Sequence, residues 1–156
     1  MLFHKKESLM LSPLSGQVVP LEEVPDEVFA KEMMGPGCAI YPEEEEVLSP
    51  LDGTVSMIAP TKHAIGLTGK DGLEILIHFG LETYKDNETA FRYCINVGDE
   101  VSKGQKLLDL DLEYFKEKEI EICTPVVILN HDLFRITDIM LNKVSKGNVL
   151  LKYKKN

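Results

Sequence analysis

Two histidines, His63 and His78, stand at the ends of the stretch HAIGLTGKDGLEILIH, on either side of a Gly-Lys-Asp-Gly cluster. β-rich runs flanking a glycine-rich turn predict a hairpin. A neutral imidazole offers a lone pair and can act as a nucleophile or a metal ligand. Two adjacent imidazoles also disfavour double protonation, which keeps one lone pair free near neutral pH. A lone histidine in a strand is usually only packed, so the pairing of the two decides the interpretation.

The pairing register of this hairpin determines whether the two rings meet. If residues 69–72 form a four-residue loop, Thr68 lies opposite Leu73 and His63 lies directly across from His78. If Asp71-Gly72 alone forms a type I′ turn, the histidines are diagonal on one face, within about 7–8 Å. Either register predicts a shallow apolar depression around the rings, whose neighbours on that face are Ile65, Leu67 and Leu76.

The remaining histidines and the cysteines show no pattern typical of a site. His4 lies near the N-terminus and His131 follows Asn130 in a turn, so neither is assigned a role. Three cysteines at Cys38, Cys94 and Cys123 form no metal-ligand spacing. We expect all three cysteines to be small, buried apolar side chains of a protein in the reducing cytosol.

Short β-rich runs separated by turn signals predict a mainly antiparallel all-β protein, in the form of a sandwich-like or barrel-like single domain. The octets LSPLSGQV and LSPLDGTV, at 11–18 and 48–55, almost coincide and indicate two related turns from a structural duplication. Helical pattern is limited to PDEVFAKEMM and to LEYFKEKE, which Asp111 precedes as an N-cap. We expect a loose tail over residues 1–10 and one domain over 11–156. The acidic run, EEEE at 43–46, is interpreted as a solvated loop.

Charge excludes several classes of partner. The chain has 156 residues and a formal charge of −9, which repels phosphate backbones and anionic membrane surfaces, so we expect no nucleic-acid binding and no membrane insertion. The same charge attracts a protein that presents arginine or lysine. No apolar stretch approaches the roughly 18 residues of a membrane span, and a cytoplasmic location is predicted.

The stretch GLEILIHFGLET, at 72–83, resembles the active-site signature of the glucose-type enzyme IIA domains of the bacterial phosphoenolpyruvate-dependent sugar phosphotransferase system. The segments PLSGQVV, VPDEVFAKEMMGPGCAI, PLDGTV, TKHA, VGDEVSKGQ and TPVVILN resemble family segments in the same order, so the resemblance covers roughly residues 11–152. It implies a fold of the duplicated hybrid motif type with a few short helical turns.

The resemblance also implies a phosphotransferase function. Such a domain accepts a phosphoryl group from the phosphocarrier HPr and passes it to the IIB domain of a sugar permease, for glucose or a related sugar. By motif position His78 is the phosphorylated residue, through Nε2. His63 donates a hydrogen bond to the phosphoryl oxygens, and Thr61 orients His63. No cofactor is required, although the family's paired imidazoles can hold zinc, which makes His63 and His78 candidate ligands. The chain lacks a G-x-x-x-x-G-K-[ST] loop, which argues against a nucleotide donor of the P-loop kind.

The family docks its partners on an apolar patch ringed by carboxylates. The matching positions are Phe29, Met33 and Met34, with Asp26 and Glu82. Spacing alone is equally compatible with core packing of a short amphipathic helix, but the resemblance favours exposure. Transporters and kinases are possible regulatory targets of such a domain.

Three positions depart from the family pattern. A usual Gly-x-Gly-Phe run reads Glu88-Thr89-Ala90-Phe91, Tyr84 replaces a small aliphatic residue, and Lys62 stands between Thr61 and His63, where Asn is frequent. We expect these departures to affect partner choice more than chemistry.

Other functions stay open at this point. INVGDEVSKGQKLL is similar to a segment of biotinyl and lipoyl domains, with Lys70 in a turn as the candidate carrier lysine. A lysostaphin-type zinc peptidase resembles the fold, but its H-x-H ligand pair is absent. A purely regulatory protein that binds partners according to its phosphorylation shares the same fold.

Overall fold

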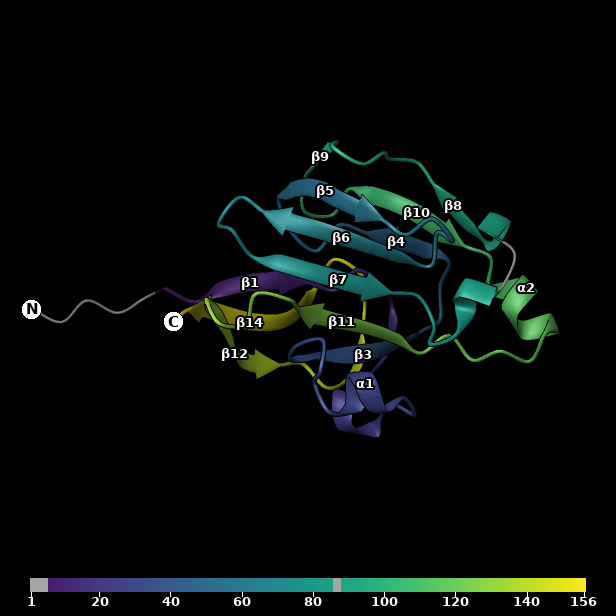
Figure 1. The fold of residues 1–156 in the computed structure, drawn as a ribbon, viewed down its shortest axis with the longest axis horizontal. Coiled ribbons are helices and arrows are strands. Elements are labelled where there is room, and N and C mark those ends of the chain that lie inside the picture. The colour runs from purple at the N-terminus through teal and green to yellow at the C-terminus, as the bar shows by residue number, and fades with distance from the viewer. Residues whose placement is uncertain (1–5, 86–87) are drawn as a thin grey trace, which may run out of the picture.

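Strands dominate the protein, a computed structural model of which describes residues 6–85 and 88–156. The largest sheet has eight antiparallel strands. Their spatial order is β13 (Asn142–Val144), β2 (Gly16–Pro20), β3 (Gly37–Pro42), β11 (Thr124–Ile128), β7 (Glu74–His78), β6 (Ala64–Gly69), β5 (Gly53–Ile58) and β9 (Glu100–Val101). Figure 1 shows β5, β6, β7, β11 and β3 side by side in one layer.

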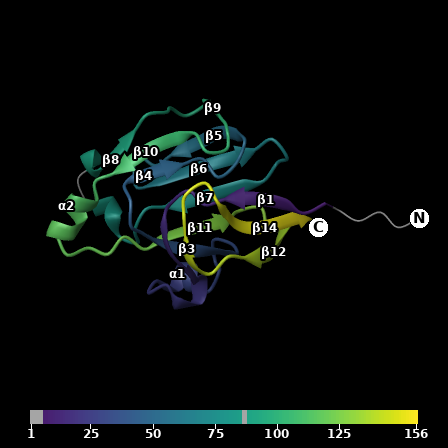
Figure 2. The same ribbon diagram turned by 180° about the vertical axis from the view of Figure 1, so that it is seen from behind.

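Two antiparallel three-stranded sheets complete the strand structure. One has the order β1 (Ser8–Leu11), β14 (Val149–Lys155), β12 (Phe134–Ile139), and the other β4 (Glu46–Leu48), β10 (Lys106–Leu110), β8 (Phe91–Tyr93). Seen from behind, β14 and β12 lie in front of the large sheet (Figure 2). The prediction of a mainly antiparallel all-β protein is confirmed.

The helices are short, and the two α-helices lie within the two segments predicted to be helical. They are η1 (Leu21–Glu23), α1 (Glu27–Ala30), η2 (Thr83–Lys85), η3 (Glu88–Ala90) and α2 (Leu112–Glu117). Asp111 caps α2 by accepting the amide of Tyr114 at 3.1 Å, as its sequence position predicts. Each helix has at most six residues, so packing rather than helix propensity holds it in place.

The main core lies against one face of the eight-stranded sheet. Alternate residues of β6 and β7, including Ile65, Leu67, Ile75 and Ile77, are fully buried in this core. A second apolar cluster occupies the other face, under η1 and α1. Its members are Leu21, Val24, Phe29, Ala39, Ala64, Leu76, Cys123 and Val127. Both faces of β6 and β7 are therefore covered, which explains their nearly continuous apolar sequence.

The two related octets form equivalent turns. In each copy the buried serine, Ser12 or Ser49, donates its hydroxyl to the carbonyl two residues later, at 2.7 Å. Each copy's first leucine donates its amide to the proline carbonyl of the other copy, at 3.0 and 2.9 Å. The sheet order has the same symmetry, because β13-β2-β3-β11 on one side corresponds to β9-β5-β6-β7 on the other. The predicted duplication is thus visible in the topology.

Part of the expected 1–10 tail belongs to the folded domain. Ser8 pairs with Tyr153 as β1 joins β14, and Met10 is fully buried. The last residues of the expected 1–10 tail therefore belong to the sheet, because the side chain of Met10 fills the core. His4 lies outside the described residues.

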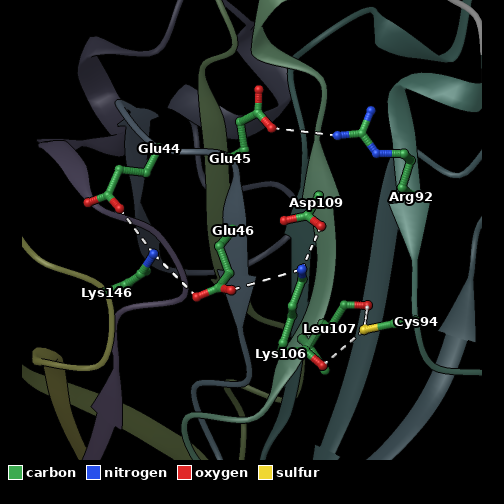
Figure 3. Close-up of polar contacts among 9 residues, drawn as sticks. All are labelled: Glu44, Glu45, Glu46, Arg92, Cys94, Lys106, Leu107, Asp109 and Lys146. Atoms are coloured by element: carbon green, nitrogen blue, oxygen red, sulfur yellow. Dashed lines mark hydrogen bonds and ion pairs between the residues drawn. The ribbon is translucent and has the colours of Figure 1, made fainter.

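The acidic run is paired rather than merely solvated. Lys146 Nζ lies 3.0 Å from Glu44 Oε2 and 3.3 Å from Glu46 Oε1 (Figure 3). Lys106 Nζ lies 2.6 Å from Asp109 Oδ2 and 4.0 Å from Glu46. The sequence interpretation missed this network because its cations are far away in the chain. Because water screens these partly exposed charges, the ion pairs add little to the stability of the fold.

Candidate phosphotransfer site

The β6–β7 hairpin turns through three residues, not the four or two considered from the sequence. Gly69 donates its amide to the carbonyl of Leu73 at 2.7 Å, which leaves Lys70, Asp71 and Gly72 in the loop. Gly72 has a φ of +95°, as a three-residue hairpin loop requires at its last position. Ala64 consequently lies opposite His78, and both expected registers are wrong.

The observed register also changes which residues surround His78. Leu76 and Ala64 share its outer face, whereas Ile65 and Leu67 point into the main core. The expected depression lined by Ile65 and Leu67 is therefore incorrect. The half-buried His78 instead borders the second apolar cluster, beside α1.

His63 reaches His78 because it stands before β6 and is not bound by the alternation of that strand. Lys62, the residue before it, has a left-handed φ of +69°, and the His63 carbonyl accepts the amide of Phe79 at 2.7 Å. The two imidazole centroids are 4.7 Å apart with an interplanar angle of 80°. The structure thus brings the two histidines together, by a turn rather than by cross-strand pairing.

Hydrogen bonds at Nδ1 set the role of each ring. His78 Nδ1 lies 2.5 Å from the carbonyl oxygen of Gly80. A carbonyl can only accept, so Nδ1 carries the proton and Nε2 keeps its lone pair. His63 Nδ1 lies 2.5 Å from Thr61 Oγ1. If the Thr61 hydroxyl donates this bond, His63 Nε2 carries a proton that it can donate to a neighbouring group.

The residues that follow His78 hold this geometry. Gly80 has a φ of +87°, and a Cβ added there would lie 2.3 Å from Thr83 Cγ2. The buried hydroxyl of Thr83 donates to the carbonyl of Phe79. The glycine and the threonine of the signature therefore shape the loop whose carbonyl fixes the tautomer of His78.

Both imidazoles favour the neutral form. Burial lowers the pKa of His63 below its ordinary value, and the neighbouring His78 lowers it further. Burial also lowers the pKa of His78, against the opposing effects of the Gly80 carbonyl and the Asp26 carboxylate. Near neutral pH the site therefore presents uncharged rings, one of them with a free Nε2 lone pair.

The expected docking residues divide into two groups. Phe29 is only 6% exposed, and its ring centroid lies 5.1 Å from that of His78. Its expected exposure is wrong, because the side chain fills the space between α1 and the sheet. Met33 and Met34 are 68% and 37% exposed, as a docking surface requires.

The two expected carboxylates also differ. Asp26 is half-buried and caps α1, since its Oδ1 accepts the amide of Val28 at 2.9 Å. Glu82 is exposed and lies 3.5 Å from Lys85. Asp26 therefore has a structural task in addition to its electrostatic effect on His78.

The three positions that depart from the family pattern lie in different surroundings. Tyr84 is 48% exposed, with its ring centroid 6.0 Å from that of His63. Lys62 occupies the left-handed position at which Asn is also favourable. In the remaining segment, η3 ends at Ala90, and both Ala90 and Phe91 are buried. The Ala90 side chain thus fills core space that the family's glycine would leave empty.

The predicted zinc site is incomplete within the part of the chain that the structure describes. No group of three or more His, Cys, Asp or Glu suited to a metal occurs in residues 6–85 and 88–156. Each histidine already uses Nδ1, so the pair offers two Nε2 atoms, half the ligands of a tetrahedral zinc site. Of the cysteines, Cys38 and Cys123 are buried as expected, but Cys94 is exposed.

Comparisons with known proteins identify the family of the chain. A model of the family described as phosphoenolpyruvate-dependent sugar phosphotransferase system, EIIA 1, matches residues 8–134. The glucose permease IIA from Mycoplasma capricolum has 34% sequence identity and a TM-score of 0.89, over 97% of this chain and 99% of that one.

Two longer relatives come from Staphylococcus carnosus (strain TM300). The chain is 46% identical over 144 residues to its PTS system glucoside-specific EIICBA component, and 43% identical over 143 residues to its PTS system glucose-specific EIICBA component. Each match covers 92% of this chain and 21% of the relative, so the chain spans about a fifth of their length. Throughout the described part of the chain, no helix is long and apolar enough to cross a membrane. The signature around His78 and these matches lead to one conclusion: the chain belongs to the EIIA 1 family of the phosphoenolpyruvate-dependent sugar phosphotransferase system.

Proposed function

We propose that this domain carries a phosphoryl group on His78 Nε2, receiving it from phospho-HPr and passing it to the IIB domain of a sugar permease. The observation that carries the proposal is the hydrogen bond between His78 Nδ1 and the Gly80 carbonyl. It directs the lone pair of a neutral imidazole to Nε2, which is the form that attacks phosphorus.

The acceptance step is an in-line displacement. The Nε2 lone pair of His78 forms the new bond to phosphorus while the bond from phosphorus to the donor breaks, and the bonding electrons return to the donor. No proton needs to leave His78, because Nδ1 keeps its hydrogen on the Gly80 carbonyl. The site therefore contributes position and charge stabilisation rather than general base catalysis.

His63 stabilises the transferred group. With the Thr61 hydroxyl donating to Nδ1, His63 Nε2–H is available to a phosphoryl oxygen on His78. The distance of 4.7 Å between ring centroids allows this without a large movement. Negative charge on His78 raises the pKa of His63 and strengthens the same hydrogen bond.

Partner docking uses the exposed surface beside the rings. Met33 and Met34 supply apolar area, and Glu82 together with Asp26 adds negative charge. A partner with basic residues around its own phosphorylated group is attracted to this surface and to the net charge of −9. We place the domain in the cytoplasm, where HPr and the permease's IIB domain meet it, with transporters and kinases as further targets. Among the described residues the two imidazoles have no third metal ligand beside them, and no step above requires zinc.

A labelling experiment tests the proposal. The purified domain is incubated with enzyme I, HPr and labelled phosphoenolpyruvate, and the label is mapped. We expect wild type and the His131→Ala control to be labelled at His78, and His78→Ala to remain unlabelled. His131 is an exposed histidine outside the site, so this control matches the loss of an imidazole. Normal labelling of His78→Ala would refute the assignment.

The alternative functions have distinct outcomes in the same material. Lys70 lies exposed in the hairpin loop, and an added biotinyl or lipoyl mass on it would identify a prosthetic-group carrier instead. Phosphorylation of His78 without transfer to any IIB domain would indicate a purely regulatory protein.

A further inference from the structure

The turn that carries His63 has a conformation that needs support. Lys62 lies in the left-handed region at φ +69°, which is unfavourable for a residue with a side chain. Its amide donates to the carbonyl of Ala59 at 2.7 Å, which closes the turn. The two residues that flank Lys62 are Thr61 and His63, so the turn sets the positions of both.

Packing alone does not hold this turn. Lys62 is exposed, and Thr61 and His63 are only half-buried. Beside the turn lies a cavity of about 480 Å³, lined among others by Lys62, Ile58 and Tyr93. On this side, the described residues line an open cavity rather than pack tightly against the turn.

A hydrogen bond from another sheet reaches the turn instead. The hydroxyl of Tyr93, at the end of β8, donates to the carbonyl of Lys62 at 2.8 Å. β8 pairs with β10, where Tyr93 lies opposite Leu108, and the Tyr93 ring packs against the main core. Burial raises the pKa of Tyr93, so the phenol keeps its proton.

We propose that Tyr93 is a positioning residue for phosphoryl transfer: by holding the Lys62 carbonyl, its hydroxyl fixes the turn that presents Thr61 and His63 to His78. Tyr93 touches neither imidazole and acts through Lys62. The bond connects the site to the main core through the sheet of β4, β10 and β8. The kinetic consequence of this inference rests on the proposed function, whereas the geometric consequence does not.

Tyr93→Phe removes the hydroxyl and keeps the ring. We expect nuclear magnetic resonance titration of the isolated domain to show the pKa of His63 moving up toward its ordinary value, because the loosened turn exposes the imidazole. Onward transfer from the phosphorylated domain should fall roughly fivefold, the rate equivalent of one ordinary hydrogen bond. Acceptance from phospho-HPr, which depends on His78, should change less.

Tyr153→Phe is the matched control. The Tyr153 hydroxyl donates to Asp71 Oδ2 at 2.6 Å, in the loop at the other end of the same hairpin. This variant also loses one phenol hydrogen bond but leaves the Lys62 turn intact. We expect an unchanged His63 titration and unchanged transfer. Both variants are compared at a temperature below their unfolding transitions. Tyr93→Leu also lacks the hydroxyl, so the pKa of His63 should shift in the same direction as in Tyr93→Phe.

Two results would overturn the inference. An unaltered His63 titration in Tyr93→Phe and Tyr93→Leu would show that the turn holds its shape without the bond. Equal changes in Tyr153→Phe would assign the effect to the stability of the hairpin. Failure of the wild-type domain to accept phosphate would refute the proposed function, but the titration would still decide whether Tyr93 positions His63.

Discussion

Gly80→Ala tests how the loop after His78 holds the site. The substitution places a Cβ in a left-handed backbone, at φ +87°, which costs about 1–2 kcal/mol of unfolding free energy. The same Cβ would lie 2.3 Å from Thr83 Cγ2, and this overpacking adds about 1–3 kcal/mol. We therefore expect a total loss of about 2–5 kcal/mol.

Gly72→Ala is the matched control, because Gly72 has a φ of +95° and nothing lies within 4 Å of an added Cβ. It should lose only the backbone contribution of about 1–2 kcal/mol. Urea unfolding of both variants measures the difference. Thr83→Ser removes the closest atom and keeps the hydroxyl, so combining it with Gly80→Ala should give a loss clearly smaller than the sum of the two single losses.

The site should respond as well. Displacement of the Gly80 carbonyl removes a bond that raises the pKa of His78, so this pKa should fall further in Gly80→Ala. The tautomer of His78 would no longer be fixed, and phosphorylation should slow. If Gly80→Ala were no less stable than Gly72→Ala, or if the losses of Gly80→Ala and Thr83→Ser were strictly additive, the proposed contact would be refuted.

Three further predictions concern the environment of the imidazoles. Thr61→Val removes the hydroxyl beside His63 Nδ1 and should slow onward transfer roughly fivefold while acceptance persists, as rapid-quench kinetics can measure; equal loss in both steps would contradict it. Phe29→Ala should cost about 3–5 kcal/mol in urea unfolding and raise the pKa of His78 through better solvation, whereas Val28→Ala on the exposed side of α1 should do neither. Because burial lowers the pKa values of both histidines below 6.5, the unfolded chain binds more protons, so the unfolding free energy should fall as pH decreases through 6.5 toward the folded values. Unfolding at a series of pH values checks this, and the pH dependence should weaken in His63→Ala; a stability that rose on acidification through this range would have the wrong sign.

The sequence predicted the strands, the N-cap Asp111 and the meeting of the two histidines, but not the geometry of that meeting. A three-residue loop and a two- or four-residue loop differ by one position in register, and Gly69–Gly72 permits each of them. The outcome depends on which residues the core accepts, and both faces of this hairpin are apolar. The orientation of His63 also depends on the left-handed backbone of Lys62, and no sequence pattern predicted that conformation.

Contacts between residues far apart in the chain were the hardest to predict. Phe29 was expected at the surface by resemblance, yet its burial follows from how α1 lies on the sheet. The cations of the acidic run and the bond from Tyr93 to Lys62 link segments tens of residues apart, which local patterns do not encode. Gly80 did have a sequence signal, since a glycine two residues after a candidate nucleophile indicates a special backbone conformation.

The most direct measurement of the central claim is nuclear magnetic resonance of the histidine ring nitrogens before and after phosphorylation. The unphosphorylated domain should show a proton on His78 Nδ1 and none on Nε2, as its bond to Gly80 requires. After phosphorylation, phosphorus should be bonded to His78 Nε2, and the pKa of His63 should be higher than before. A phosphoryl group on His78 Nδ1, or on His63, would contradict the account.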